Sequence, residues 1–212
     1  KNSIPLESVM SKVWNNKIFK HIQNEVDQAS KKLADERGSC LDAEEYGFKE
    51  RFSNKTAIAP TASISIICGG ASPGIEPVAA NSYTHKTLSG SYNVRNRYLK
   101  KILKKHSKDD DETWSTITTN QGSVEHLDFL TDHEKAVFKT AFELDQKWII
   151  ELGADRTPYV SQAQSINIFL PADVHKKELH QIHFQAWKKG LKSLYYCRSK
   201  SIQRAENVNN GL

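Results

Sequence analysis

The sequence has few of the residues that stabilise small secreted domains or bind structural metals. Its three cysteines, Cys40, Cys68 and Cys197, lie far apart, and no cysteine–histidine cluster has the spacing of a zinc site. This odd, sparse count argues against a disulfide framework and fits a reducing cytoplasm. We therefore expect a cytoplasmic protein with no metal site of its own.

Long apolar runs and the best-known phosphate-loop signature are also missing. No stretch reaches membrane-spanning length, the first residues lack the pattern of a secretory signal, and no glycine-rich turn ends in Gly-Lys-Ser/Thr. The sequence starts at Lys1 without a methionine. We expect it to be a piece of a longer polypeptide, either a split-gene product or a truncation.

The charge balance is mildly basic, but the positive residues do not form a stripe. The net charge is +5 at pH 7, and 38% of the residues are hydrophobic, which suits a folded domain. The densest basic stretch, residues 95–108, is followed at once by an acidic run at residues 109–112. It lacks the aromatic interleaving typical of single-strand binders. We expect a solvated face with its own counter-charges, and neither a nucleic-acid partner nor a membrane partner.

Helical periodicity is strongest near the start of the chain. Residues 7–37 are predicted to form one helix, which Gly38 ends. Its apolar residues recur at helical spacing with polar residues between them, and they are Ile18, Ile22, Val26, Ala29 and Leu33. Residues 81–128 give weaker signals, which predict a short helix around residues 99–103 and an exposed acidic loop at residues 109–112.

A second helical pattern begins at a capping box. Thr131 is followed three residues later by Glu134, so each side chain can bond to the backbone of the other residue. A single long helix is predicted from this point. Its expected buried face comprises Val137, Phe138, Ala141, Leu144, Trp148 and Leu152.

The last part of the chain has the order strand, helix, strand. Residues 165–170 and 193–197 are predicted as strands, and residues 173–189 as a helix that ends at Gly190. This order is a βαβ unit, which makes the two strands parallel. Chemistry in parallel α/β barrels collects at the carboxyl ends of the strands, and Tyr195–Tyr196 is predicted near such an end.

Small residues follow a short apolar run that ends at Pro60. Thr61, Ala62 and Ser63 stand where a helix is predicted to begin, and free N–H groups at a helix start bind phosphate well. An ordinary strand-to-helix turn with a Ser or Thr cap explains the same residues. From the residues alone, the ordinary turn is the better-supported interpretation.

The adjacent tyrosines Tyr195 and Tyr196 also have an ordinary explanation. Neighbouring aromatic residues in a strand usually pack, one on each face of the sheet. Cys197 beside them adds little, because a lone cysteine is more often a small buried hydrophobe than a reactive thiol. From the residues alone, packing is again the better-supported role.

Six short segments, considered together, change this balance. They are Ala59-Pro60-Thr61-Ala62-Ser63, Gly74-Ile75-Glu76-Pro77, Ser89-Gly90, Asn120-Gln121-Gly122-Ser123, Gln162-Ala163-Gln164-Ser165-Ile166-Asn167-Ile168 and Phe184-Gln185-Ala186-Trp187-Lys188-Lys189-Gly190-Leu191-Lys192-Ser193-Leu194-Tyr195-Tyr196. In order and spacing, they resemble the large (alpha) subunit of class I ribonucleotide reductase. The resemblance covers roughly residues 55–200 and is weaker in the opening helix.

The resemblance implies an α/β fold, the carboxy-terminal part of a ten-stranded α/β barrel that is incomplete without its upstream half. Residues 1–200 are expected to form this portion of the catalytic barrel, and residues 201–212 a flexible polar tail. The implied enzyme is a ribonucleoside-diphosphate reductase, an oxidoreductase that makes deoxyribonucleoside diphosphates for DNA synthesis by a radical mechanism. The chain is expected to be inactive alone.

The same resemblance implies roles for two groups of residues. The stretch that binds the substrate phosphates, mostly through backbone N–H groups, corresponds to Pro60, Thr61, Ala62, Ser63 and Ile64. Tyr195 and Tyr196 match a stacked pair that relays a radical. The oxidising equivalent is expected to reach Tyr196 first, to pass to Tyr195, and then to oxidise an active-site cysteine.

Cofactors and partners are implied in the same way. The chain itself is expected to bind no cofactor, because the di-metal/tyrosyl radical belongs to a separate small (beta) subunit. A thioredoxin- or glutaredoxin-type reductant is expected to regenerate the enzyme. The thiyl cysteine, the reducing cysteine pair and the effector sites are expected upstream of Lys1, in the other part of the large subunit. The expected location is the cytoplasm, which is the host cytoplasm if the source is viral.

Three features depart from the family's pattern. None of the three cysteines falls at a catalytic cysteine position, and the loop from Pro60 to Glu76 is slightly longer than usual. The last residues, up to Leu212, lack the cysteine pair that family members commonly carry. A non-catalytic module that binds nucleotide phosphates is therefore the alternative function.

Overall fold

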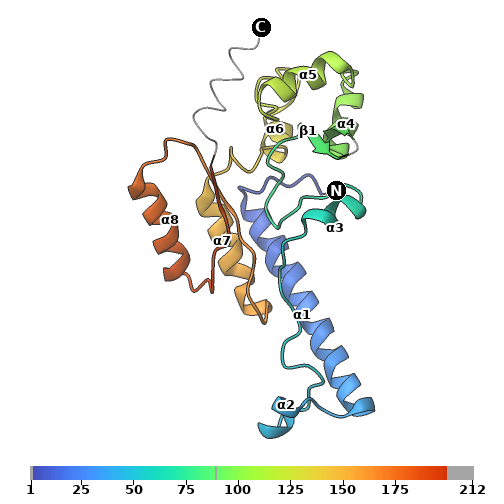
Figure 1. Cartoon of the computed structure of the whole chain (residues 1–212), viewed down its shortest axis with the longest axis vertical. Helices are drawn as coiled ribbons and strands as arrows, with labels where there is room; N and C mark the ends of the chain where they lie inside the picture. Colours follow the sequence, from blue (N-terminus) through green and yellow to red (C-terminus); the bar gives the residue numbers. More distant parts are fainter. Residues whose placement is uncertain (1, 89, 200–212) are drawn as a thin grey trace.

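The chain forms an α/β body, a smaller lobe of helices with a hairpin, and one long helix beside them (Figure 1). The computed structural model describes residues 2–88 and 90–199, so the predicted tail at residues 201–212 lies outside the described residues. The helices are α1 Val9–Arg37, α2 Leu41–Glu45, α3 Ala62–Ile67, α4 Arg97–Lys105, α5 Asp111–Thr119, α6 Asp132–Val137, α7 Gln146–Arg156 and α8 Lys176–Lys188, with a 3-10 turn at Thr157–Tyr159. The strands are β1 Ser82–Thr87, β2 Gly90–Arg95, β3 Ile168–Leu170 and β4 Cys197–Ser199. None of the described helices combines the length and the apolar character that a membrane-spanning segment needs.

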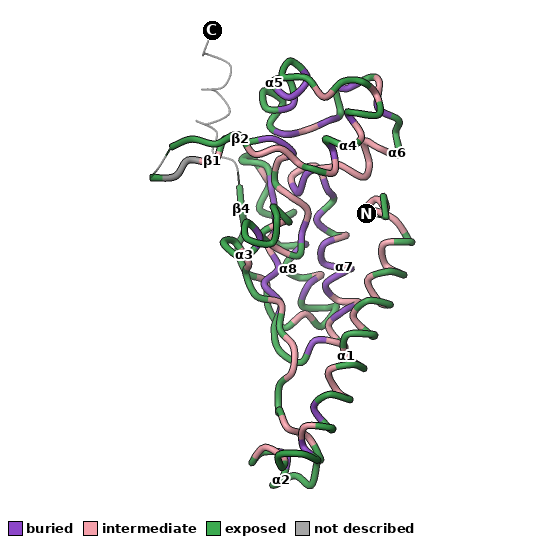
Figure 2. The backbone as a smooth tube through the Cα atoms, turned by 90° about the vertical axis from the view of Figure 1, so that its right-hand side faces the viewer, coloured by how far each residue is buried: buried purple, intermediate pink, exposed green. Residues whose placement is uncertain are grey.

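Helix α1 is the longest element, and its far half extends away from the body (Figure 1, Figure 2). Ser8 caps its start by accepting the Ser11 N–H at 3.2 Å, and Gly38, at φ 80°, ends it, close to the predicted bounds. The helix is confirmed, but its apolar residues are not a buried face, because Ile18 and Ile22 are 46% and 38% exposed. Periodicity identifies an apolar face but not what covers it, and the described chain leaves this face open to solvent.

Three parallel segments form the middle of the α/β body. Residues 56–58 pair with residues 162–165 on one side, and residues 195–199 pair with residues 166–170 on the other. The hydrogen bonds run from Gln162 N to Thr56 O, Ile58 N to Ala163 O, Ser165 N to Ile58 O, Tyr195 N to Ile166 O and Ile168 N to Tyr196 O. The parallel strands of the predicted βαβ unit are thereby confirmed.

The second predicted strand begins later than the sequence indicated. Strand β4 starts at Cys197, so Tyr195–Tyr196 precedes the regular strand instead of lying at its carboxyl end. The chain needs residues 191–194 to return from α8, because the Leu191 N–H still bonds to a carbonyl of that helix. The tyrosine pair therefore does not lie at the carboxyl end of a strand, and its predicted position was wrong.

Helices α7 and α8 cover β3 with an apolar core. Helix α8 begins after His175, which caps it, and ends before Gly190, which has φ 79°. The buried side chains of this layer are Ile149, Ile150, Ile166, Ile168, Leu170, Ile182 and Ala186. Their burial fixes the position of β3 and, through it, of the segments paired on either side.

The smaller lobe builds a separate core from α4, α5 and the turns that follow them. This core comprises Leu99, Leu103, Trp114, Ile117, Val124, Leu127 and Leu130. The β1–β2 hairpin of the lobe was not predicted, whereas the short helix around residues 99–103 is confirmed as α4. The predicted acidic loop was wrong, because Asp110 accepts the Thr113 N–H at 2.7 Å and caps α5.

The basic stretch at residues 95–108 has its own counter-charges, as the sequence predicted. Arg95 Nη2 lies 2.7 Å from Asp111 Oδ1, and Lys100 Nζ lies 3.9 Å from Asp109 Oδ2. Both ion pairs join this stretch to the start of α5. The acidic run therefore belongs to the fold of the lobe.

The single helix predicted from Thr131 is divided into two. The capping box is confirmed, with both hydrogen bonds between Thr131 and Glu134 present, but α6 ends at Val137. Asp145 then starts α7 by accepting the Lys147 N–H at 2.9 Å. A new cap inside the apolar pattern interrupts the helix, and hydrophobic spacing alone does not reveal it.

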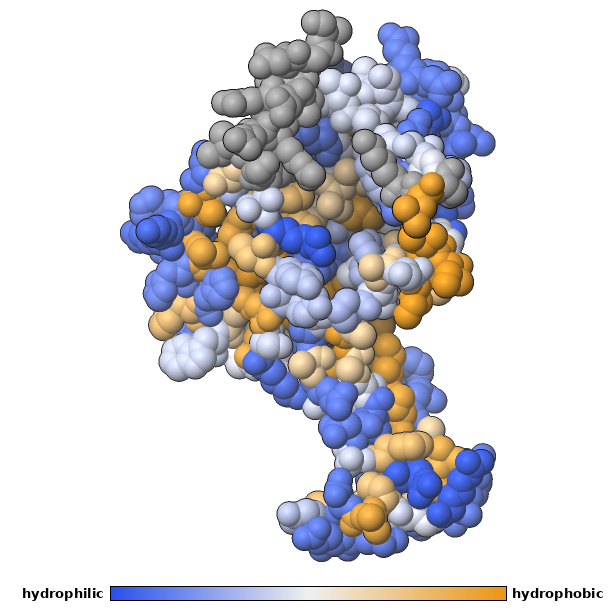
Figure 3. Space-filling model, in the orientation of Figure 1, coloured by the Kyte–Doolittle hydropathy of each residue, from blue (hydrophilic) through white to orange (hydrophobic). Residues whose placement is uncertain are grey.

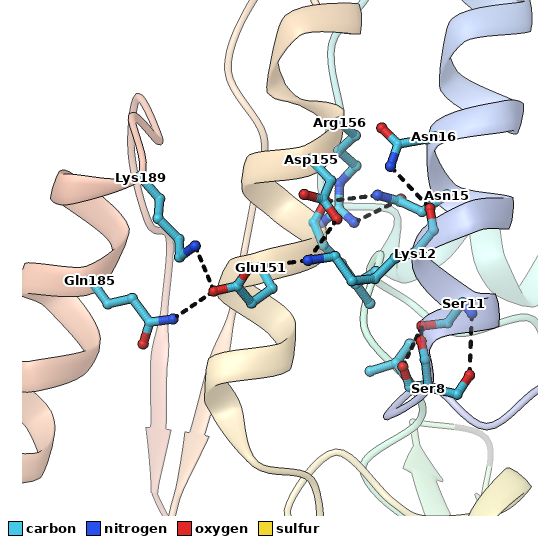
Figure 4. Close-up of polar contacts among 12 residues, drawn as sticks. Ser8, Ser11, Lys12, Asn15, Asn16, Glu151, Asp155, Arg156, Gln185 and Lys189 are labelled. Atoms are coloured by element: carbon cyan, nitrogen blue, oxygen red, sulfur yellow. Dashed lines mark hydrogen bonds and ion pairs between the residues drawn. The ribbon is translucent and has the colours of Figure 1, made fainter.

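One carboxylate on α7 ties three helices together (Figure 4). Glu151 accepts hydrogen bonds from Lys12 of α1 at 3.2 Å, and from Lys189 and Gln185 at the end of α8 at 2.7 and 3.1 Å. The Lys189 hydrogen bond lowers the pKa of Glu151 below its ordinary value, and Lys12 adds to the effect, although partial burial opposes it. The three helices are thus held by one charged centre.

Removing this carboxylate tests what it contributes to stability. Glu151→Gln keeps the side-chain shape without the charge, so we expect a loss of about 1 kcal/mol at pH 7, or about 2–4 °C in Tm. Because the pKa of Glu151 is depressed in the folded state, its stabilisation is present above the unfolded-state pKa. It is lost as the pH falls through the folded-state value.

Urea unfolding at several pH values down to about 3 measures this difference. The matched control is Glu125→Gln, which changes an exposed glutamate. We expect the difference in unfolding free energy between Glu151→Gln and the original chain to shrink at acidic pH. If it stays the same, the ionised Glu151 is not the source of the stabilisation.

Candidate functional site

The residues predicted to bind phosphate, Pro60–Ile64, form the turn that leads into α3. Thr61 occupies the cap position, and both its N–H and its hydroxyl donate to the Pro73 carbonyl at 3.1 Å. An ordinary Ser/Thr cap would accept a backbone N–H of the helix with its hydroxyl, and the Thr61 hydroxyl does not do so. The strand-to-helix turn is confirmed, but the ordinary role of its threonine is not.

Backbone donors are available at the start of α3. The Ser65 N–H bonds to the Thr61 carbonyl at 2.8 Å, which closes the first turn of the helix. Within the described chain, the N–H groups of Ala62, Ser63 and Ile64 donate to no acceptor, and the three residues are exposed. Adjacent amide donors of this kind can bind the oxygens of an anion.

The two predicted relay residues lie against each other. The ring centroids of Tyr195 and Tyr196 are 4.2 Å apart at an interplanar angle of 58°. Consecutive side chains of a regular strand point to opposite faces, so this contact excludes the arrangement with one tyrosine on each face. The rings are 49% and 54% exposed, and they do not belong to the core of the described chain.

The environment of the tyrosine pair is polar. The hydrogen bond to the Tyr196 side chain raises the pKa of Tyr195, which means that the phenol keeps its proton more firmly than usual. The Arg198 guanidinium lies 5.4 Å from the Tyr196 ring centroid, and its charge acts on the pKa of Tyr195 in the opposite direction. The two phenols are therefore close neighbours in an exposed setting beside one cation.

A buried polar cluster beside these segments was not identified from the sequence. Glu76 and Arg156 are each 4% exposed, and Arg156 Nε donates to Gln164 Oε1 at 2.6 Å. Burial lowers the pKa of Arg156 to about 10, while the charges of Glu76 and Asp155 oppose this shift. Glu76 and Gln164 belong to two of the six segments on which the family resemblance rests. The resemblance therefore pointed to these residues, but it assigned no function to either of them.

Thiols and metal ligands do not gather at these residues. Cys68 and Cys197 are exposed, Cys40 is half-buried, and all three are free. In residues 2–88 and 90–199, no group of three His, Cys, Asp or Glu side chains is arranged to hold a metal ion. The candidate site of this chain therefore consists of the amide donors and the two phenols.

Comparisons with known proteins agree on one family. The family model for the barrel domain of ribonucleotide reductase matches residues 41–197. The ribonucleoside-diphosphate reductase large subunits of Invertebrate iridescent virus 6 and Invertebrate iridescent virus 3 are 47% and 40% identical to this chain, each over 97% of it. The matched region includes α3, the buried cluster and the tyrosine pair.

A solved structure supports the same relationship. The Actinobacillus ureae class Id ribonucleotide reductase alpha subunit matches 99% of this chain with a TM-score of 0.86 and 37% identity. The chain spans only part of these relatives, 22% and 33% of the two viral proteins and 38% of the solved alpha subunit. The predicted fold, part of an α/β barrel, is confirmed, and the chain belongs to the family of ribonucleotide reductase large subunits.

Proposed function

We propose that this chain supplies the substrate-phosphate site and part of a radical relay to a ribonucleoside-diphosphate reductase. The observation that carries the proposal is the contact of two exposed phenol rings at 4.2 Å in a member of this family. The complete enzyme reduces ribonucleoside diphosphates at the 2′ carbon. Because the chain spans a minor part of each relative, it acts only together with the rest of the large subunit.

The diphosphate of the substrate binds at the start of α3. The N–H groups of Ala62, Ser63 and Ile64 are exposed donors at the positive end of the helix. The double contact between Thr61 and Pro73 holds the turn in shape before the ligand arrives. Pro60 ends the preceding strand-like segment and directs the chain into the turn. Recognition through the backbone explains why no Lys or Arg is needed within these five residues.

The radical reaches Tyr196 first and then Tyr195. In each step, a phenol loses one electron and one proton, and the preceding radical gains both, so charge and atoms balance. The raised pKa of Tyr195 favours loss of the proton together with the electron over early ionisation. Tyr196 is 54% exposed and therefore open to a donor outside this chain. We assign that donor to the small (beta) subunit with its di-metal/tyrosyl radical, and regeneration to a thioredoxin- or glutaredoxin-type reductant.

The rest of the large subunit packs against surfaces that this chain leaves open (Figure 3). Apolar side chains that are 38–85% exposed line α1 and α3: Met10, Val13, Trp14, Ile18, Ile22, Ile64, Ile66 and Ile67. Stable soluble proteins rarely expose such surfaces without a partner. Residues 56–58 and 195–199 are edge segments of the described sheet, and a cavity of about 460 Å³ opens beside Trp14 and Ile18. Further barrel strands can pair with the two edge segments, and further helices can cover the exposed apolar faces of α1 and α3.

Substitution of Ser63 tests the phosphate site. In the enzyme assembled from this chain, the rest of the large subunit and the small subunit, Ser63→Asp brings a negative charge beside the diphosphate. We expect the substrate Kd to rise about tenfold or more. Thr61→Ala and Ser63→Ala keep the amide donors, so we expect a change of about threefold at most.

Equilibrium binding of a ribonucleoside diphosphate gives these Kd values. Ser53→Asp, at an exposed serine before the turn, is the control for added charge. If Ser63→Asp binds substrate as tightly as the control while the fold is intact, the phosphate assignment is wrong.

Phenylalanine at each tyrosine separates redox chemistry from packing. Tyr195→Phe and Tyr196→Phe keep the ring and remove the hydroxyl, which costs about 0.5–1.5 kcal/mol if one hydrogen bond is lost. A phenyl ring is too hard to oxidise, so we expect near-zero formation of deoxyribonucleoside diphosphate by either variant. The substrate Kd and the Tm are expected to stay close to normal.

The test uses the assembled enzyme with saturating small subunit, and Tyr159→Phe serves as the control because Tyr159 lies in the 3-10 turn. Substantial turnover in either relay variant assigns that tyrosine to packing instead.

A further inference from the structure

Glu76 is buried, yet its carboxylate has two well-placed donors on a single residue. Its Oε1 accepts the Asn167 backbone N–H at 2.5 Å, and its Oε2 accepts from Asn167 Nδ2 at 3.2 Å. Glu76 is 4% exposed, so these contacts lie in a site largely closed to water. Buried hydrogen bonds to a carboxylate are short and strong, and they join the two segments firmly.

A glycine two positions earlier makes room for this carboxylate. A Cβ at Gly74 would overlap Glu76 Oε2 and would come within 3.4 Å of Asn167 Nδ2. The Gly-Ile-Glu sequence therefore lets the carboxylate fold back over its own chain toward the sheet. The spacing of Gly74 and Glu76 in the resemblance segment thus has a physical reason.

Asn167 occupies the position between the two backbone contacts of the tyrosine pair. The carbonyl of Ile166 accepts the Tyr195 N–H at 2.8 Å, and the N–H of Ile168 donates to the Tyr196 carbonyl at 2.8 Å. Any shift of Asn167 along the strand therefore moves the backbone of both tyrosines. Glu76 therefore holds the strand at the residue between Ile166 and Ile168, whose backbones bond to the two tyrosines.

The other side of Glu76 is connected to the phosphate turn. The Pro73 carbonyl, three residues before Glu76, accepts both donors of Thr61 at 3.1 Å. Ser72 Oγ donates to the Glu76 carbonyl at 2.5 Å, which closes the loop between them. Hydrogen bonds and a few covalent links therefore lead from the phosphate turn to the tyrosine pair.

Arg156 is a buried positive group on which the charge of Glu76 acts, raising the pKa of Arg156 against the effect of burial. It is 4% exposed, and Gln164, three residues before Asn167, holds its Nε at 2.6 Å. A buried carboxylate without a nearby positive charge is costly. Gln164 and Asn167 belong to the same segment, residues 162–170. This segment therefore holds Arg156 and also contacts Glu76.

We propose that Glu76 is a positioning residue, which fixes the phosphate turn and the tyrosine pair relative to each other through Asn167. This inference rests on the proposed function, because it assumes that both places serve one reaction. The radical must reach a substrate whose phosphates are anchored elsewhere, so their relative position matters to the rate. Misplacement by about 1 Å can lower a rate by about 100-fold.

The experiment compares Glu76→Gln, Asn167→Ala and the double variant in the assembled enzyme. Glu76→Gln keeps one oxygen acceptor and sets an amide NH₂ against the other of the two Asn167 donors, and Asn167→Ala removes the Nδ2 donor alone. We expect kcat to fall about tenfold or more in Glu76→Gln and less in Asn167→Ala, while the substrate Kd changes by less than about threefold. The double variant is expected to be no slower than Glu76→Gln, because both changes affect one contact.

Glu143→Gln is the matched control, since Glu143 also accepts a backbone N–H, from Thr140 at 2.7 Å, away from this loop. Amide hydrogen exchange at Tyr195 and Ile168 adds a readout that needs no turnover, and we expect it to be about tenfold faster in Glu76→Gln. If Glu76→Gln fails to fold because Arg156 loses its counter-charge, Asn167→Ala carries the test.

Normal kcat and unchanged amide exchange in the folded variants overturn the inference, as do losses that add in the double variant. A fall in substrate affinity with normal kcat also overturns it. If the Tyr→Phe variants retain turnover, the relay assignment fails by itself, and amide exchange still decides whether Glu76 positions the strand.

Discussion

The parallel pairing of residues 162–170 on both of their edges is the constraint on which the rest of the structure depends. One edge holds residues 56–58, which lead into the turn at residues 60–64, and the other holds residues 195–199, which begin with the tyrosine pair. Helices α7 and α8 bury the apolar side of this segment, and Glu151 ties both helices to α1. Residues 56–58 and 195–199, which are far apart in the sequence, are thereby held on the two edges of the same strand.

Local signals in the sequence predicted the elements whose ends depend on local chemistry. Gly38 and Gly190 end helices because their positive φ suits a residue without a side chain, and Thr131 with Glu134 forms the expected capping box. The cap at Asp145 was missed, since the apolar spacing continues across it. The parallel strands followed from the order of elements, which limits the connection to few arrangements.

Long-range contacts were beyond the reach of such patterns. Glu76 and Asn167 are 91 positions apart, and only the folded chain brings the carboxylate to the strand. The contact between Tyr195 and Tyr196 likewise depends on where β4 begins, which hydrophobic spacing did not fix. The apolar residues of α1 were recognised, but their spacing did not reveal that Ile18 and Ile22 stay exposed in the described chain. The family resemblance implied roles for the two groups of residues, and the structure adds the contacts between the segments that carry them.

The central claim is that this chain is an essential but incomplete part of a ribonucleotide-reducing enzyme. The most direct measurement is formation of deoxyribonucleoside diphosphate by the purified chain, first alone and then with the rest of the large subunit, the small subunit and a dithiol reductant. We expect no product from the chain alone, and product only when all the components are present. Product from the chain alone contradicts the account, and so does full activity of the other components without it.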